Sequence, residues 1–434
     1  MHGVHSNNGS QQCWTQINAI TSFIDGSHIY GSSKARVSAL KDEGTPYLLK
    51  VKLINNTEFP PERTGPDVDS CIKRNGSDDI CFDTGDGRGN ENPSQAVLYT
   101  IFLREHNRIA RQIKSLKPNA TDEGIFETAR KIIGALLQKI TYVDYFGALL
   151  GRDINTHYLF AHKGRTKFNP SVDPSAIISF ATAAFRLRYT QIIDTVPVGD
   201  TLKVPLSEVY NRPAFAIDNL EDLVHGMTSG SSRLQGNQIR TNALDRNFVQ
   251  GVTNKYYEPL ERPGYGLDLV ALTIQRGRDH GLPSYTKFRE FCNLRPLTGF
   301  DDTDALGPFA SNFAQVYNSV DDIDLFPALM HEKLVTGLGG PTLNCLLVIG
   351  FYRLKFGDRF FFTHDQEQFG FNNAQLASIR STTLARIFCH NTNIDSLPSA
   401  VFRLPSSKNR FVSCETLRTG GLDLELFADL STQV

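Results

Sequence analysis

Three stretches of the sequence gather residue types that could carry chemistry. Residues 103–109 read LREHNRI, residues 275–285 read QRGRDHGLPSY, and residues 16–31 read QINAITSFIDGSHIYG. His106 and His280 could ligate a metal, because a neutral imidazole is a common metal ligand. Each could equally be a structural histidine that only forms hydrogen bonds, so the residue types alone leave both roles open.

A phenol close to two arginines is a further candidate ligand. Tyr189 lies three residues after Arg186 and one residue after Arg188. A phenol must be ionised to bind a metal, and a nearby guanidinium favours the ionised form. On a helix, Arg186 would reach the face of Tyr189, whereas Arg188 would point away. The competing interpretation is that Tyr189 fills the core, as helical tyrosines on apolar faces usually do.

The seven cysteines indicate disulfide bonds. Six of them either bracket a loop or lie in apolar, helix-like segments: Cys71 with Cys81, Cys389 with Cys414, and Cys292 with Cys345. Cys13 is left over, and the absence of a C-x-x-C pattern argues against a zinc ribbon or a thioredoxin-type site. We predict three disulfides and one cysteine whose partner lies upstream. The alternative is seven buried free thiols in a cytosolic protein.

Composition bounds the possible functions. The chain has 434 residues, 40% of them hydrophobic, and a formal net charge of -1. A near-neutral chain offers no electrostatic reason to bind nucleic acid or an anionic membrane, and no apolar run approaches the roughly 20 residues of a membrane span. Residues 1–12 lack the apolar region of a signal peptide. Four N-glycosylation sequons begin at Asn8, Asn55, Asn75 and Asn119. Together with Cys13, these features predict a secreted glycoprotein whose chain starts inside a longer parent.

The elements that position the candidate residues are predicted to be mostly helices. Apolar residues recur at helical spacing in four segments: 94–116, 122–150, 174–193 and 266–281. Residues 15–32 are expected to form a short helix that runs into a loop, and residues 33–92, rich in Gly, Pro, Asn and Asp, a loop-dominated region. Few alternating strand patterns occur, and no low-complexity linker interrupts the chain. The sequence therefore predicts one mostly α domain over residues 1–434.

In order and spacing, the three stretches resemble animal haem peroxidases of the myeloperoxidase, peroxidasin and peroxinectin kind. The resemblance runs from about Cys13 to about residue 420. It implies many helices around a haem pocket, with hydrogen peroxide and a small reducing substrate as reactants. It also implies the three disulfides proposed above and an extracellular location. By the same resemblance, His106 and His280 are structural and do not contact iron.

On the distal side of the haem, the resemblance gives a catalytic role to Arg88. The family arginine follows a Gly-Asp-x pattern, which here is Gly85-Asp86-Gly87, and it stabilises negative charge as the peroxide bond breaks. Glu91 matches the glutamate that can form an ester to haem. The distal histidine, and the aspartate that forms a second ester, belong to a family segment that would lie upstream of Met1. Without the family, Arg88 would be interpreted as a solvated loop charge.

On the proximal side, the chain departs from the family. Tyr189 occupies the position of the haem-ligating histidine, and Thr273 that of the asparagine that accepts a hydrogen bond from it. A joint change of this kind is expected when a ligand and its hydrogen-bond partner are released from constraint. Arg186 and Arg276 are expected to bind haem propionates. A tyrosinate can itself ligate haem, as it does in catalases.

A calcium loop is also implied by the resemblance. The family pattern Thr-x-Phe-x-Asp-x-Ser corresponds to Thr21, Phe23, Asp25 and Ser27. Hydroxyl, carbonyl and carboxylate oxygens suit this hard cation. A further aspartate, beside the distal histidine, would complete the site. The alternative is a loop held by a capping aspartate without a metal.

Three functions remain open after the sequence is read. The first is a haem peroxidase, a peroxide-dependent oxidoreductase, that is impaired because the distal histidine is absent and Tyr189 replaces the proximal one. Loss of a general base commonly lowers a rate by roughly 100 to 10,000-fold. The second is a non-catalytic extracellular scaffold that binds matrix or adhesion partners. The third is a catalase-like haem protein whose ligand is the Tyr189 phenolate.

Overall fold

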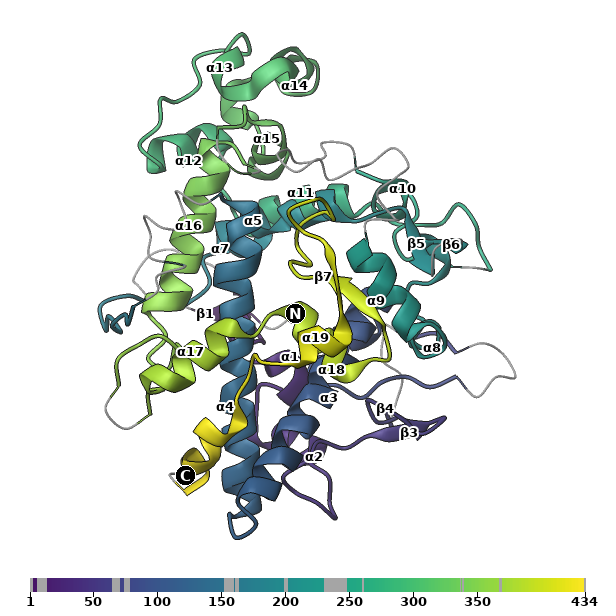
Figure 1. Ribbon diagram of the computed structural model, residues 1–434. Coiled ribbons are helices and arrows are strands. Elements are labelled where there is room, and N and C mark those ends of the chain that lie inside the picture. Colours follow the sequence, from purple (N-terminus) through teal and green to yellow (C-terminus); the bar gives the residue numbers. More distant parts are fainter. Residues whose placement is uncertain are drawn as a thin grey trace.

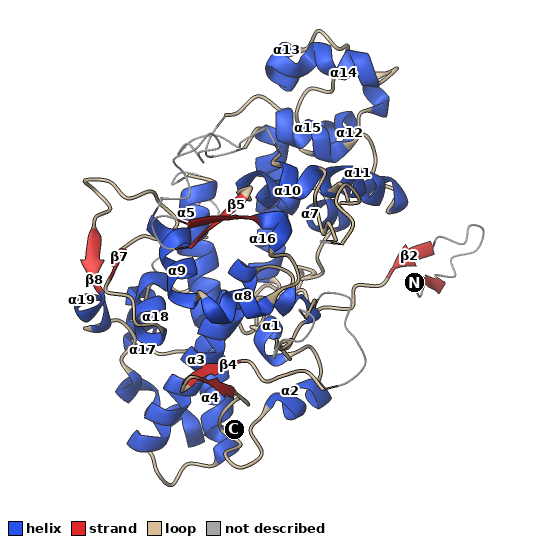
Figure 2. Cartoon of the chain, turned by 90° about the vertical axis from the view of Figure 1, so that its right-hand side faces the viewer, coloured by secondary structure: helices blue, strands red, loops and turns tan. Residues whose placement is uncertain are grey.

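The computed structural model describes most of the chain. The described residues are 3–5, 14–64, 71–73, 79–151, 160, 164–198, 202–229, 248–259, 261–335, 337, 339–366 and 369–432. Helices dominate them, and strands occur only in small two-stranded sheets (Figures 1 and 2). The mostly helical fold predicted from the sequence is confirmed. Among these residues, no helix is both long enough and apolar enough to cross a bilayer.

Two long helices, α3 (Pro93–Leu116) and α4 (Asp122–Lys139), pack against each other at the centre of the core. Each begins with a side-chain cap, because Asn92 accepts from the main-chain nitrogen of Gln95 and Thr121 from that of Gly124. Their buried faces carry the apolar residues whose spacing predicted them, and Ile109 and Ile132 are fully buried. The chain continues through the π-helical turn η2 (Ile140–Tyr145) into α5 (Phe146–Leu149).

The other helices follow in chain order, with 3-10 segments marked η. They are α1 (Ser27–Tyr30), α2 (Lys34–Leu40), η1 (Gly87–Asn90), α7 (Ile178–Thr182), η3 (Ala184–Gln191), η4 (Leu206–Glu208), α8 (Pro213–Asp218), α9 (Leu220–Ser229), α10 (Gln250–Thr253), α11 (Leu269–Asp279), α12 (Tyr285–Phe291), α13 (Thr303–Leu306), η6 (Gly307–Phe309), α14 (Ala310–Val316), η7 (Val320–Asp322), α15 (Leu325–His331), α16 (Pro341–Phe356), α17 (Asn373–Ser381), α18 (Leu384–Asn391), α19 (Cys414–Arg418) and η8 (Leu424–Thr432).

The strands of the described residues pair as four antiparallel, two-stranded sheets. They are β1 (Gly3–His5) with β2 (Trp14–Gln16), β3 (Lys52–Ile54) with β4 (Thr57–Phe59), β5 (Thr195–Val198) with β6 (Leu202–Pro205), and β7 (Ser396–Pro398) with β8 (Phe411–Ser413).

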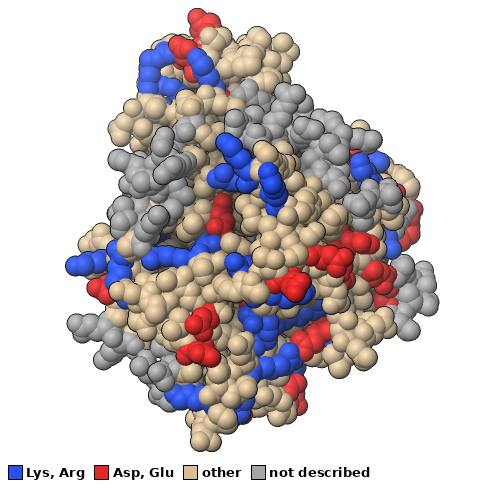
Figure 3. Space-filling model, in the orientation of Figure 1, with Lys and Arg blue, Asp and Glu red and all other residues tan. Residues whose placement is uncertain are grey.

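On the face shown in Figure 3, basic and acidic side chains both occur across the described surface.

Two sequence-based helix assignments were wrong. The segment expected as a helix at 15–32 contains the end of β2, a loop, and only the four residues of α1. Gly26 adopts a positive φ of 78° just before α1, so the chain turns there and does not continue a helix. The helix expected at 174–193 is divided, because Ala183 leaves helical geometry between α7 and η3. In contrast, α11 ends near Gly281, whose φ is 64°, as the sequence indicated.

The predicted disulfides are present in the described residues. Cys71 bonds to Cys81, Cys292 to Cys345, and Cys389 to Cys414. Cys13 lies outside the described residues. The second bond joins the end of α12 to α16 in the group of helices at the top of Figure 1, and the third joins α18 to α19.

Candidate functional site

Arg88 lies in the short 3-10 helix η1, and the residues just before η1 pack against α1. The Asp86 carboxylate accepts from the main-chain nitrogen of Arg88 at 2.9 Å and from its Nε at 2.8 Å. A side chain on Gly85 would overlap the main chain of α1, because its Cβ would lie 2.7 Å from the carbonyl carbon of Ile29. Only glycine permits this approach. The Arg88 side chain is half exposed, so its guanidinium remains accessible while Asp86 orients it.

Two side chains that the sequence analysis did not single out lie beside this arginine. The ring of His28, from α1, meets the ring of Tyr99, from α3, edge-on at a centroid distance of 5.0 Å. Burial lowers the pKa of His28 to about 4, against the opposing effect of Asp86. Burial also raises the pKa of Tyr99. At neutral pH the arginine therefore faces a neutral imidazole and a neutral phenol.

Glu91 follows η1 and interacts with a tyrosine cluster. Burial raises the pKa of its carboxyl, although Arg88 and a hydrogen bond from Tyr257 act in the opposite direction. Tyr257 has a φ of 52°, which is strained for an aromatic residue. Its ring stacks on Tyr256 at 4.0 Å and meets Tyr210 edge-on at 5.1 Å. The adjacent Tyr256 and Tyr257 are visible in the sequence. Their contact with Glu91 could not be predicted from it, because the two segments are far apart along the chain.

Tyr189 is buried in η3 and is bound by Arg186. The Tyr189 hydroxyl accepts from Nη1 of Arg186 at 2.6 Å, and Nε of Arg186 donates to the carbonyl oxygen of Ala181 at 2.9 Å. A 3-10 helix brings residues i and i+3 into line, so the expected contact between them is realised. Arg188, next to Tyr189 in sequence, is exposed whereas Tyr189 is buried, as expected, although its guanidinium carbon lies 5.8 Å from the Tyr189 ring centroid.

The two predicted haem contacts on α11 differ in their hydrogen bonding. Thr273 is fully buried, and its hydroxyl donates to the carbonyl oxygen of Leu269 at 2.7 Å. In the part of the chain that is described, Nη1 of Arg276 is buried and has no hydrogen-bond partner. A buried guanidinium nitrogen without an acceptor is costly. A carboxylate such as a haem propionate would satisfy it, so Arg276 fits the role that the family resemblance assigns.

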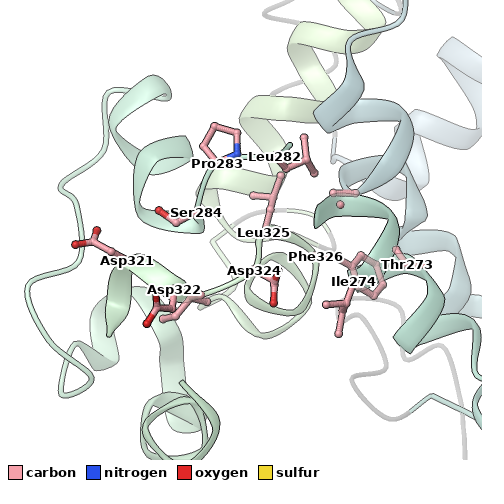
Figure 4. Close-up of a pocket in the computed structure, with 13 residues that line it drawn as sticks. Thr273, Ile274, Leu282, Pro283, Ser284, Asp321, Asp322, Asp324, Leu325 and Phe326 are labelled. Carbon is pink, nitrogen blue, oxygen red and sulfur yellow. The ribbon is translucent and has the colours of Figure 1, made fainter. Parts of the chain in front are cut away.

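A cavity of about 140 Å³ lies beside Thr273, between α11, α15 and the start of α12 (Figure 4). Its lining includes Ile274, Asp324 and Phe326. The Asp324 carboxylate is already bound by Arg278 at 2.6 Å. The cavity is smaller than the roughly 300 Å³ of a typical ligand pocket. Of the predicted haem contacts, only Thr273 lines it, so this cavity is not the haem site.

The two signature histidines both make structural contacts. Nδ1 of His106 is 2.9 Å from the Tyr30 hydroxyl, and its Nε2 is 3.3 Å from the carbonyl oxygen of Tyr47. Burial lowers the pKa of His106 to about 3. Nδ1 of His280 lies 2.8 Å from the carbonyl oxygen of Arg276. These contacts support the structural roles and place neither histidine beside Tyr189.

The predicted calcium residues lie in the loop before α1. The main-chain nitrogen of Phe23 donates to Oγ1 of Thr21 at 3.1 Å, and that of Ser27 to Oδ1 of Asp25 at 3.0 Å. Burial, reinforced by the negative charge of Asp25, raises the pKa of the Asp358 carboxyl to about 6. No cluster of three or more acidic, histidine or cysteine side chains is found among the described residues. A cation here would therefore depend on carbonyl and hydroxyl oxygens in addition to Asp25.

Calcium is expected to stabilise the protein through Asp25. Calcium at 100 times its dissociation constant should raise the free energy of unfolding by about 2.7 kcal/mol, the gain for a ligand that binds only the folded state. The bound cation would also relieve the repulsion between Asp25 and Asp358. Thermal unfolding with calcium or with magnesium measures the effect. The gain should vanish in Asp25→Asn and persist in Glu43→Gln, a control at an exposed side chain. An equal calcium shift in Asp25→Asn and the wild type would show that this loop does not bind the ion.

Tyr256 interacts electrostatically with Glu91, Tyr189 and Arg276, and Glu91 with Arg188, so residues from η3, α11 and the end of η1 border one region of the molecule. The chain matches the family model for animal haem peroxidase over residues 2–402. It therefore belongs to the animal haem peroxidase family.

Curated relatives agree with this assignment. The chain is 34% identical to the mouse peroxidasin homolog over 95% of its own length and 28% of that protein. It is 33% identical to a Drosophila melanogaster peroxidase (95% of the chain, 61% of that protein) and 31% identical to mouse thyroid peroxidase (96% and 46%). The chain thus spans between about a quarter and three fifths of the length of these relatives.

Solved structures share the fold at lower identity. Peroxidase A from Dictyostelium discoideum superposes with a TM-score of 0.72 at 24% identity, covering 92% of this chain and 73% of that one. A fatty acid alpha-dioxygenase from Oryza sativa superposes with a TM-score of 0.66 at 18% identity, covering 90% and 66%. At these identities the likeness concerns the fold.

Proposed function

We propose that the protein binds haem between η1, η3 and α11 and reacts only slowly with hydrogen peroxide. The observation that carries the proposal is the buried Nη1 of Arg276, which lacks the anionic partner that a propionate would provide. Haem would supply an iron centre for peroxide reduction. The chain would supply the anion contact at Arg276 and an accessible guanidinium at Arg88.

Arg88 is the residue best placed to act on peroxide. Its guanidinium is accessible and is oriented by Asp86, so it can stabilise negative charge on a peroxide oxygen. Glu91 lies three residues after Arg88 at the end of η1, and a hydrogen bond from Tyr257 holds its carboxyl group there. We assign Glu91 to haem contact by the family resemblance.

We propose slow turnover because the two residues at the proximal haem positions, Tyr189 and Thr273, differ from those of the family. Thr273 donates its hydroxyl to Leu269 within its own helix, so it does not orient a ligand as the family asparagine does. Tyr189 is not a histidine, but a tyrosinate can ligate haem. The Arg186 guanidinium contacts its oxygen at 2.6 Å, and a hydrogen bond from a cation is stronger when the acceptor is ionised. We therefore propose the Tyr189 phenolate, held by Arg186, as the haem ligand.

Secretion is part of the same proposal. Three disulfides cross-link the described part of the chain. Such bonds persist in oxidising compartments and are rare in the cytosol. If the protein retains no haem, the same disulfides and the calcium loop favour the second function, a non-catalytic extracellular scaffold.

Haem titration followed by the Soret absorbance tests the proposal. Arg276→Gln should weaken haem binding by about tenfold or more, because it removes a charged hydrogen-bond donor. Arg278→Gln is the matched control, since Arg278 lies on the same helix but is exposed and paired with Asp324. Equal affinity in the two variants, or no retained haem in the wild type, would contradict haem binding at this site.

The ligand assignment has a separate readout in the spectrum. Tyr189→Phe should shift the Soret band of the haem-loaded protein, whereas an unchanged spectrum would mean that Tyr189 only fills the core. Tyr189→His combined with Thr273→Asn reinstates the family pair and should strengthen haem retention. No gain in the double variant would indicate that another part of the pocket limits binding.

A further inference from the structure

The β3–β4 hairpin carries a sequon at its tip. Ile54 pairs with Thr57, so Asn55 and Asn56 form the two-residue turn. Their φ values are 50° and 59°. Two-residue hairpin turns with positive φ at both positions favour asparagine and glycine. The turn therefore explains why two asparagines occur here, but it does not require a threonine after them.

The first two residues of the sequon are exposed to solvent, and Thr57 is partly exposed. The side chains of Asn55 and Asn56 are exposed, and the hairpin extends outward at the lower right of Figure 1. Within the described part of the chain, no hydrogen bond involves the side-chain amide of Asn55, while Oγ1 of Thr57 donates to its main-chain carbonyl oxygen at 3.3 Å. The acceptor nitrogen is therefore free of competing contacts.

An apolar side chain beside the turn is also uncovered. Leu53, two residues before Asn55, is 63% exposed and lies opposite Glu58 in the sheet. An exposed leucine on a two-stranded hairpin gains nothing from the core. A large polar group attached at Asn55 would cover this surface and keep an unprotected strand edge from pairing with another chain.

We propose that Asn55 carries an N-linked oligosaccharide. The Asn-Asn-Thr sequence satisfies the acceptor pattern, and the modification would be bulky and solubilising. A bond forms between Nδ2 of Asn55 and the anomeric carbon of a lipid-pyrophosphate-linked oligosaccharide. The bond from that carbon to the pyrophosphate breaks, and the amide proton leaves with the pyrophosphate. This inference rests on the secretory route of the proposed function and is independent of haem.

The sequon at Asn119 is a weaker candidate. Oγ1 of Thr121 accepts from the main-chain nitrogen of Gly124 at 3.1 Å and so caps α4. Ala120, the middle residue, is buried in the core. Two of the three sequon residues are therefore committed to structure. The sequons at Asn8 and Asn75 lie outside the described residues.

A matched pair of variants isolates Asn55. Asn55→Gly removes the acceptor, and Asn56→Gly keeps the sequon as Asn-Gly-Thr. Both variants preserve the turn, because glycine adopts positive φ without strain. Each is expressed as the full chain behind a cleavable secretion leader in animal cells, so the result does not depend on the natural route of export.

The glycan is measured on the secreted protein. Peptide-N-glycosidase in heavy-oxygen water converts an occupied asparagine to a mass-labelled aspartate, which mass spectrometry assigns within the peptide. We expect the label at Asn55, the loss of one glycan in Asn55→Gly, and no loss in Asn56→Gly. An unlabelled Asn55, or the same number of glycans in both variants, would overturn the proposal. Haem titration of the same material reports separately on the haem site.

Discussion

Replacing Glu332 by alanine is expected to destabilise the protein by about 3–5 kcal/mol, the usual cost of removing one partner from a buried charged network. Glu332 is fully buried between α15 and α16. Its carboxylate accepts from the main-chain nitrogens of Thr342, at 3.0 Å, and Leu343, at 3.2 Å. It therefore caps the first turn of α16, where the helix dipole favours a negative charge.

Two further donors make the loss of Glu332 larger than the loss of a cap alone. The Tyr285 hydroxyl donates to its Oε1 at 2.9 Å, and Nη1 of Arg289 lies 3.4 Å from the same atom. Both side chains come from α12, so Glu332 connects three helices. Alanine would leave these buried donors without their acceptor.

Urea and thermal unfolding measure this effect. Glu332→Gln keeps the shape and one acceptor oxygen, so it should cost less than Glu332→Ala. Lys333→Ala is the neighbouring control, because its ion pair with Asp304 is exposed on both sides and such pairs contribute about 0–1 kcal/mol. A loss below about 1 kcal/mol in Glu332→Ala would mean that the network does not hold the three helices together.

Gly85→Ala is the second substitution for which we expect a large effect. The added methyl group would overlap main-chain atoms of Ser27, Ile29 and Gly31. Main-chain atoms cannot move aside as a flexible side chain can, so the segment that leads into η1 must separate from α1. Overpacking of this kind costs about 1–3 kcal/mol, and more where the contact is rigid. The separation would also displace Arg88 from the site.

A glycine two positions later provides the matched control. A Cβ on Gly87 would meet no atom within 4 Å, so Gly87→Ala should change stability by less than about 0.5 kcal/mol. Both variants are compared by thermal unfolding and by haem titration. Gly85→Ala should lower both stability and haem affinity. Equal behaviour of the two variants would show that the close approach of η1 to α1 is not maintained in solution.

Short-range features were predictable from the sequence. The periodicity of α3 and α4, the end of α11 near Gly281, and the contact between Arg186 and Tyr189 all depend on residues within one or two helical turns. Such contacts follow from backbone geometry, so spacing in the sequence is sufficient to infer them. The cysteine pairs could be proposed for a different reason, because few cysteines exist and each pair brackets a loop or joins apolar segments.

The surroundings of each site were decided by the tertiary structure. His28 meets Tyr99, Glu91 meets Tyr257, and the charge of Asp25 acts on Asp358, although the members of each pair are far apart along the chain. Packing also overrode local pattern where Ala183 interrupts the helix expected at 174–193. By itself, the sequence determined the helical class, the cysteine pairs and the type of residue at each family position. Whether a carboxylate is desolvated, or a buried guanidinium lacks an acceptor, depends on which distant segments exclude water from it, and only the folded chain decides that.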